Sequence, residues 1–222
     1  MKWIRNLCSA AVLSTLASVA VAGTQVNAGI SVSDDGVKGF YLAIGQAYNV
    51  PEREVIAVHE RRIPDDEIPV VYFIARQARV QPNVVIEFRL GGHSWFEVSR
   101  HFGLGPDVYY VECREVPKGP YGRAIGYYRN RPRSEWKQIR LADDDIVNLV
   151  NVRFAADRYH YRPEEVIRLR ENNHSYVVVN REAQRGRHHD SERNVERKAE
   201  KKKVVIVEGS SKDKRGHGHR DD

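Results

Sequence analysis

The chain has 222 residues, of which 41% are hydrophobic and 30% are charged, and its formal net charge at pH 7 is +6. Two cysteines are too few for a secreted scaffold that depends on disulfides, so the fold must depend on a hydrophobic core. The positive charge is carried by the two ends of the chain, and the balanced middle excludes nucleic-acid binding through net charge alone.

The N-terminal segment has the pattern of a secretory signal peptide. Lys2 and Arg5 precede an uncharged run of small and apolar residues at 7–22, which ends in the motif Ala-Val-Ala. Signal peptidases cleave after such a small–x–small motif. We therefore expect a signal peptide over residues 1–22, with a second cleavage motif as late as residue 28. The mature protein is expected to be exported, to the periplasm or the extracellular space.

The apolar run of this signal is shorter than the roughly 20 residues that a bilayer-spanning helix needs. Cleavage is therefore expected, with no membrane association beyond the signal peptide. It would leave Cys113 as the single thiol of the mature chain. We expect Cys113 to be buried, and an intermolecular disulfide is the alternative.

One sequence pattern occurs three times in the middle of the chain. The copies are AYNVPEREVIAVHE at 47–60, QARVQPNVVIEFRL at 77–90 and RYHYRPEEVIRLRE at 158–171. Each copy has a proline and then three apolar residues whose spacing places them on one helical face. These trios are Val55, Ile56 and Val58; Val85, Ile86 and Phe88; and Val166, Ile167 and Leu169. A basic residue follows each trio: His59, Arg89 or Arg170.

The second and third copies continue into a tight turn and another helix. Gly92 and Asn173 occupy equivalent places after the proline-led helix, and both residue types tolerate the left-handed conformation that ends helices. Ser94 and Ser175 then follow as expected N-caps. In the first copy we expect Asp65 to cap the next helix.

These patterns predict an all-α protein, a small helical-repeat array of helix-turn-helix-like pairs at residues 30–184. An insertion is expected at 103–142, between the second and third copies. The predicted helices lie near 37–48, 52–62, 66–79, 83–91, 95–102, 121–130, 143–160, 164–171 and 175–184. The helix at 143–160 is expected to bury a stripe of Ile146, Leu149, Val150 and Phe154.

The string V-x-P-x-x-V-I-x-x-R…G-H-S-W-x-E-V resembles the tri-helical units of DNA-binding regulators. Recognition helices need several hydrogen-bond donors aimed at base edges, whereas the helix after Ser175 begins with apolar residues. Export would also separate the protein from DNA. We therefore expect no DNA binding and interpret the pattern as a device for helix packing.

Motifs for catalysis are not expected in this chain. His93-Ser94 and His174-Ser175 recur at equivalent places, and adjacent residues at a helix start diverge too far to act as base and nucleophile. Asp143–Asp145 lacks the glycine and distal glutamate of a calcium loop and is interpreted as an acidic first turn. We therefore expect no catalytic residue and no cofactor, with a small envelope hydrolase as the alternative.

The segment 118–140 has the composition of a binding surface. Its seven basic residues are opposed by Glu135 alone, and four aromatic residues are interleaved with them. Such a mixture binds anionic polymers through charge and stacking. The candidate partner-binding residues are Arg123, Tyr127, Tyr128, Arg129, Arg131 and Trp136. In the alternative interpretation, Tyr127 and Trp136 belong to the core and the arginines pair with acids such as Asp143–Asp145.

Residues 185–222 are rich in mixed charge without apolar periodicity, which is typical of a disordered tail. Val204–Val207 is the exception and could add a strand to a partner's sheet. Four tail histidines are weak candidates for binding a divalent metal: His188, His189, His217 and His219. The sequence thus favours an exported, non-catalytic protein that binds a protein or an anionic envelope component. Metal handling through the tail is an alternative.

Overall fold

The computed structural model describes residues 34–115, 117–172 and 175–187. This part of the chain is helical throughout and contains no strand, which confirms the predicted all-α class. No helix in it is both long enough and apolar enough to cross a membrane. The predicted signal peptide, Val204–Val207 and the four tail histidines lie outside the described residues.

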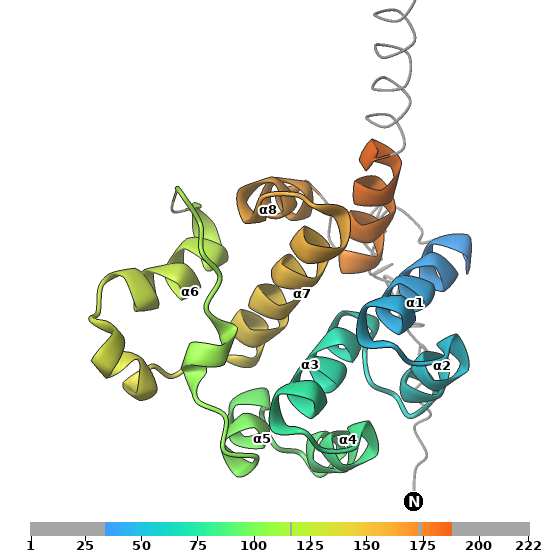
Figure 1. Cartoon of the computed structure of the whole chain (residues 1–222), viewed down its shortest axis with the longest axis horizontal. Coiled ribbons are helices and arrows are strands. Elements are labelled where there is room, and N and C mark those ends of the chain that lie inside the picture. Colours follow the sequence, from blue (N-terminus) through green and yellow to red (C-terminus); the bar gives the residue numbers. More distant parts are fainter. Residues whose placement is uncertain (1–33, 116, 173–174, 188–222) are drawn as a thin grey trace, which may run out of the picture. The chain divides into compact units, whose positions relative to one another are not determined.

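The helices lie within a few residues of their predicted positions. Their bounds are α1 (Asp34–Tyr48), α2 (Glu52–Glu60), α3 (Ile68–Ala78), α4 (Pro82–Leu90), α5 (Trp95–His101), α6 (Gly119–Arg129), α7 (Asp143–Tyr159) and α8 (Pro163–Glu171) (Figure 1). Short 3-10 helices occur as η1 (Asp65–Glu67), η2 (Pro106–Tyr109) and η3 (Arg133–Gln138). A further helix covers 176–187, so residues 185–187 are helical, and the prediction that the tail begins at 185 is wrong for them.

Each copy of the sequence pattern begins where a long helix ends. The residue after α1, α3 and α7 is Asn49, Arg79 or His160, and its φ of 57°, 58° or 57° is left-handed. A short helix with a proline at or just before its start follows each time, and it packs against the long helix that precedes it. The three copies are therefore structural repeats, each made of a long helix, a left-handed stop and a short helix.

The apolar trios lie on the buried faces of the short helices. The fully buried members are Val55 and Val58 in α2, Val85 and Ile86 in α4, and Val166 and Ile167 in α8. The remaining members are half-buried against the same core: Ile56, Phe88 and Leu169. Full burial of one such side chain contributes about 1.5 to 3 kcal/mol, so the trios dock the short helices.

The long helix α7 lies at the centre of the core and contacts α1, α3, α5, α6 and α8. Figure 1 shows it between α6 and α3. Its predicted stripe of Ile146, Leu149, Val150 and Phe154 is buried, as expected. Because α6 packs on α7, residues 103–142 are joined to the same core as the repeats.

The predicted turn between α4 and α5 is confirmed. Gly92 has a φ of 89°, and Ser94 caps α5 by accepting a hydrogen bond from the Glu97 amide at 3.2 Å. The Glu97 carboxylate in turn accepts from the Ser94 amide at 2.8 Å, which completes a capping box. In the third copy Ser175 accepts from the amide of Val177 at 3.1 Å.

The prediction that Asp65 caps a helix is wrong. The chain enters α3 through η1, and the N-cap positions of these two helices are Pro64 and Glu67, so Asp65 caps neither. It accepts a hydrogen bond from the Tyr41 hydroxyl at 2.7 Å and lies 2.8 Å from Nδ1 of His59. A tertiary contact to α1 and α2 thus replaces the local capping contact.

Candidate functional site

The three acidic residues of η1 each contact the basic residue of a different repeat. The pairs are Asp65 with His59 at 2.8 Å, Glu67 with Arg89 at 2.9 Å, and Asp66 with Arg170 at 3.8 Å. All three carboxylates precede the first turn of α3, where the helix dipole favours negative charge. The contacts therefore tie all three short helices to the start of α3.

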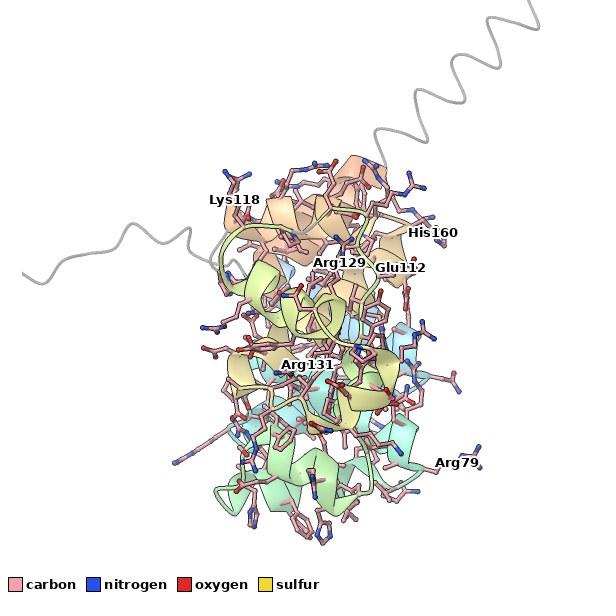
Figure 2. All side chains as sticks on the ribbon, turned by 90° about the vertical axis from the view of Figure 1, so that its left-hand side faces the viewer. Arg79, Glu112, Lys118, Arg129, Arg131 and His160 are labelled. Atoms are coloured by element: carbon pink, nitrogen blue, oxygen red, sulfur yellow. The ribbon has the colours of Figure 1, made fainter. Side chains whose placement is uncertain are left out.

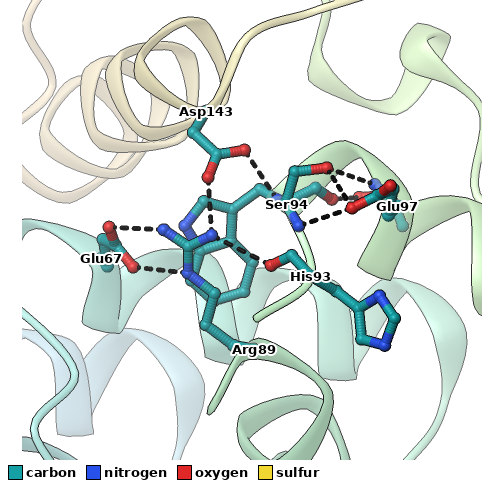
Figure 3. A network of polar contacts seen from close by, with 8 residues as sticks. Glu67, Arg89, His93, Ser94, Glu97 and Asp143 are labelled. Atoms are coloured by element: carbon teal, nitrogen blue, oxygen red, sulfur yellow. Dashed lines mark hydrogen bonds and ion pairs between the residues drawn. The ribbon is translucent and has the colours of Figure 1, made fainter. Parts of the chain in front are cut away.

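Arg89 makes the densest of these contacts (Figure 3). Its guanidinium donates two hydrogen bonds to Glu67, at 3.0 and 2.9 Å, and one to Asp143 at 2.6 Å. It also donates to the carbonyl oxygen of His93 at 3.0 Å and lies 4.7 Å from the ring centre of Trp95. The second oxygen of Asp143 accepts from the Trp95 amide at 2.7 Å. Arg89 thus joins the starts of α3, α5 and α7.

The third copy repeats this arrangement with different partners. Arg170 lies 4.8 Å from the ring centre of Tyr176, which occupies the place of Trp95. Asp66 accepts from the Tyr176 amide at 3.0 Å, as Asp143 does for Trp95. The basic residues of the repeats therefore have partners inside the fold, and they stabilise it instead of facing a ligand.

Asp66 gives this network a pH dependence. Burial raises the pKa of its carboxyl, although the Tyr176 amide and Arg170 oppose the shift. The Asp66 carboxyl therefore binds its proton more tightly in the folded protein than in the unfolded chain. On this account the free energy of unfolding falls as pH rises from the usual aspartate pKa, about 4, to the raised value.

We expect Asp66→Asn to remove the pH dependence that this carboxyl gives to the free energy of unfolding. The asparagine side chain keeps an oxygen that accepts from the Tyr176 amide. The stability of the variant relative to the wild type should then improve as pH rises from about 4 to about 7. Urea unfolding at several pH values measures this, and Asp144→Asn, at an exposed site in α7, is the matched control. A stability difference that stays constant with pH would contradict the assignment.

The His93-Ser94 pair serves as a helix cap. The His93 ring points away from Ser94 (Figure 3) and lies 5.6 Å from the ring of Phe88. The Ser94 hydroxyl donates to the Glu97 carboxylate at 2.9 Å as part of the capping box, and it is not bonded to the His93 ring. His174 lies outside the described residues. No three His, Cys, Asp or Glu side chains of the described part gather where they could hold a metal ion.

The candidate binding residues of 118–140 do not form one surface. Tyr128 is only 1% exposed, and its hydroxyl donates to the carbonyl oxygen of Pro106 at 2.7 Å. Its predicted role in binding is therefore wrong. Arg129 donates to the carbonyl oxygens of Cys113 and Arg114, which holds the loop before α6 in place.

Cys113 itself is a buried thiol, as the sequence predicts. Burial raises its pKa to about 11, and the nearby carboxylate of Glu164 adds to the shift. Because the thiolate is the reactive form, this cysteine is poorly suited to nucleophilic chemistry.

Three other candidates, Arg123, Tyr127 and Arg131, line a hollow of about 320 Å³ on α6. Figure 2 shows Arg131 and Arg129 on this face of the molecule. Arg123 lies 3.4 Å from Asp145, so the alternative in which these arginines pair with the acids of α7 is correct for this residue. All the residues that line this hollow lie between 122 and 131, in α6 and just after it, so no second helix encloses a ligand there.

Trp136, the last candidate, lines a different and larger site that the sequence did not predict. Two cavities of about 460 and 540 Å³ adjoin at Arg153 of α7. The basic residues that line them are Arg76, Arg133, Lys137, Arg153, Arg158 and Arg187, and the acidic residues are Asp107 and Asp157. Their aromatic walls are Tyr48, Phe73, Tyr110, Trp136 and Phe154. We call this site the arginine groove.

Guanidinium groups of the arginine groove lie over its aromatic rings. The distances to the ring centres are 4.7 Å for Arg76 on Tyr48, 5.2 Å for Arg133 on Trp136 and 5.5 Å for Arg153 on Phe73. None of the six basic side chains forms an ion pair with a carboxylate of the described residues. The groove thus holds a local excess of positive charge that the fold does not neutralise.

Arg153 forms the shared wall of the two cavities. It donates to the carbonyl oxygen of Val108 at 2.9 Å and to that of Tyr110, so its position is fixed by the chain around η2. Burial lowers the pKa of its guanidinium because the charged form loses hydration, and the nearby carboxylate of Asp157 offsets only part of this shift. An anion bound in the groove would restore that lost stabilisation.

No protein-family model, no curated protein and no solved structure matches this chain.

Proposed function

We propose that this protein is an exported, non-catalytic binding protein whose arginine groove holds an anionic partner, either a protein or a component of the cell envelope. The observation that carries the proposal is the gathering of six basic side chains against two carboxylates in one concave site. Three of the guanidinium groups are positioned on aromatic rings that line the groove, which reduces the entropy lost when they bind an anion.

The groove supports binding better than catalysis. Arginine and aromatic side chains make up most of its walls, and its two carboxylates, Asp107 and Asp157, line different cavities. No serine, threonine or cysteine of the described residues lines either cavity, so neither carboxylate has a hydroxyl or thiol nucleophile beside it there. His160, on its rim, is the left-handed residue that ends α7. The serine and the cysteine that could act as nucleophiles, Ser94 and Cys113, do not line either cavity.

DNA is not among the ligands that we propose. In a helix-turn-helix protein, the N-terminal residues of the second helix contact the bases. Here Trp95, the first residue of α5, is buried, and so are residues 176–179 at the start of the last described helix. The first turns of these two helices are buried in the core, so they are not placed to contact base edges.

Retention on an immobilised sulfated polysaccharide tests the proposal. We expect the double variant Arg76→Gln with Arg133→Gln to bind about tenfold more weakly than the wild type, because each exposed charge contact contributes up to about 1 kcal/mol. Arg53→Gln with Arg100→Gln is the matched control, since both arginines are exposed and lie outside the groove. The same loss in both double variants would show that binding follows total charge and would refute a role for the groove.

A further inference from the structure

The arginine groove presents the edges of guanidinium groups instead of open aromatic faces. Arg76 covers Tyr48, and Arg133 covers Trp136. Neither guanidinium donates a hydrogen bond to another described residue. A guanidinium that lies on a ring keeps its in-plane N–H groups free, and two of these match the two oxygens of a carboxylate.

This arrangement disfavours ligands that stack. The ring of Tyr48 is stacked on Tyr72 at 5.6 Å in addition to its contact with Arg76. Trp136 contacts Tyr110 at 4.7 Å and Tyr128 at 5.1 Å in addition to Arg133. Nucleobases and sugar rings bind to uncovered aromatic faces, and both of these rings are already covered.

The shape and the surroundings of the groove disfavour a lipid bilayer. A flat anionic surface cannot enter concave cavities, and proteins that lie on membranes add exposed apolar side chains. The large hydrophobic side chains exposed in the described residues are Leu42 and Leu90. Leu90 lies away from the groove, and Leu42 lines only the cavity that adjoins the groove along α1, which is too little apolar surface to enter a bilayer.

The length of the groove suits an extended chain. A third cavity of about 350 Å³ shares Gln46, Arg158 and Arg187 with the groove and continues it along α1. Gln46 and Gln77 place amide groups along this path, and amides pair with a peptide backbone.

The protein's own C-terminal residues fit the groove less well than a separate acidic chain. Residues 188–222 carry ten basic and eight acidic side chains, a net charge of +2. A segment of that charge is repelled by six basic residues overall.

We infer that the arginine groove binds an extended acidic segment of a partner protein, with aspartate or glutamate carboxylates paired to its guanidinium groups. The inference rests on the proposed function and specifies the class of partner. A short glutamate-rich peptide with a fluorescent label is the probe, and its anisotropy is measured with the full-length protein. We expect binding to this peptide and none to a glutamine peptide of equal length.

The variants separate bidentate recognition from simple charge. Arg76→Gln with Arg133→Gln should weaken peptide binding about tenfold. Arg76→Lys with Arg133→Lys keeps the charge but loses the paired N–H geometry, and we expect it to lose most of the same affinity. Arg53→Gln with Arg100→Gln should bind as the wild type does. Full affinity in the lysine variant would overturn the inference.

Competition experiments distinguish failure of this inference from failure of the proposed function. If a polyuronate, an oligonucleotide or anionic vesicles displaced the peptide at a lower concentration than unlabelled peptide did, the peptide assignment would be wrong. If the glutamate peptide did not bind while the sulfated polysaccharide still required Arg76 and Arg133, the groove would bind anions of another class. If neither probe depended on these arginines, both proposals would fail.

Discussion

Replacing Trp95 with alanine is expected to lower the free energy of unfolding by about 4 kcal/mol, because it empties a large space in the core. The side chain is 0% exposed, and it is among the largest fully buried side chains of the described residues. It also lies beneath Arg89, so its loss removes the ring on which that guanidinium rests. Urea unfolding followed by circular dichroism measures the change.

Two controls show whether packing is the cause. The indole N–H of Trp95 has no hydrogen-bond partner in the described part of the chain, so Trp95→Phe should cost only about 1 to 2 kcal/mol. Leu90→Ala truncates a side chain that is 48% exposed and should cost less than about 1 kcal/mol. An equal loss in Trp95→Ala and Leu90→Ala would refute the central position of this tryptophan.

Replacing Arg89 with alanine is expected to cost about 3 kcal/mol, because it leaves two partly buried carboxylates without their cation. The side chains of Arg89 and Glu67 are 20% and 17% exposed, and that of Asp143 is 31% exposed. The value lies at the lower end of the range for buried pairs because water still reaches this network. The unfolding midpoint in urea measures the loss.

Arg162→Ala provides the comparison for Arg89→Ala. Arg162 pairs with Glu165 at 3.0 Å, but its side chain is 56% exposed and its partner lies on the same helix turn. Such a pair contributes little to stability, so the midpoint should remain at the wild-type value. Similar losses in the two variants would show that the network of Arg89 does not link α3, α5 and α7.

The burial of Tyr128 could be predicted from the apolar spacing in the sequence of α6. The buried residues of this helix are Tyr121, Ala124, Ile125 and Tyr128, which follow helical spacing. Tyr127, directly beside Tyr128, is half-exposed. The composition of 118–140 favoured placing Tyr127, Tyr128 and Trp136 on one surface, but the helical period puts Tyr127 and Tyr128 on different faces of α6.

The left-handed residues that end the long helices show the limit of what local sequence predicts. Asn49 is a residue type that tolerates positive φ, so the stop after α1 is visible in the sequence. Arg79 and His160 occupy the same conformation after α3 and α7, and neither residue type predicts it as asparagine or glycine does. At these two positions the left-handed conformation is imposed by tertiary packing, because the short helix that follows turns back to pack on the long one.

The sequence by itself determined the helices, the buried faces of the short helices, the Ser94 cap and the buried thiol. These features depend on residues within one or two helical turns of each other, so spacing reveals them. Only the tertiary structure decided which charges are neutralised and which are not. Arg89 and Arg170 pair with carboxylates of η1, whereas Arg76, Arg153 and Arg187 gather around a cavity without forming an ion pair in the described residues. Residues far apart in the chain meet only through helix packing, and no local pattern encodes that meeting.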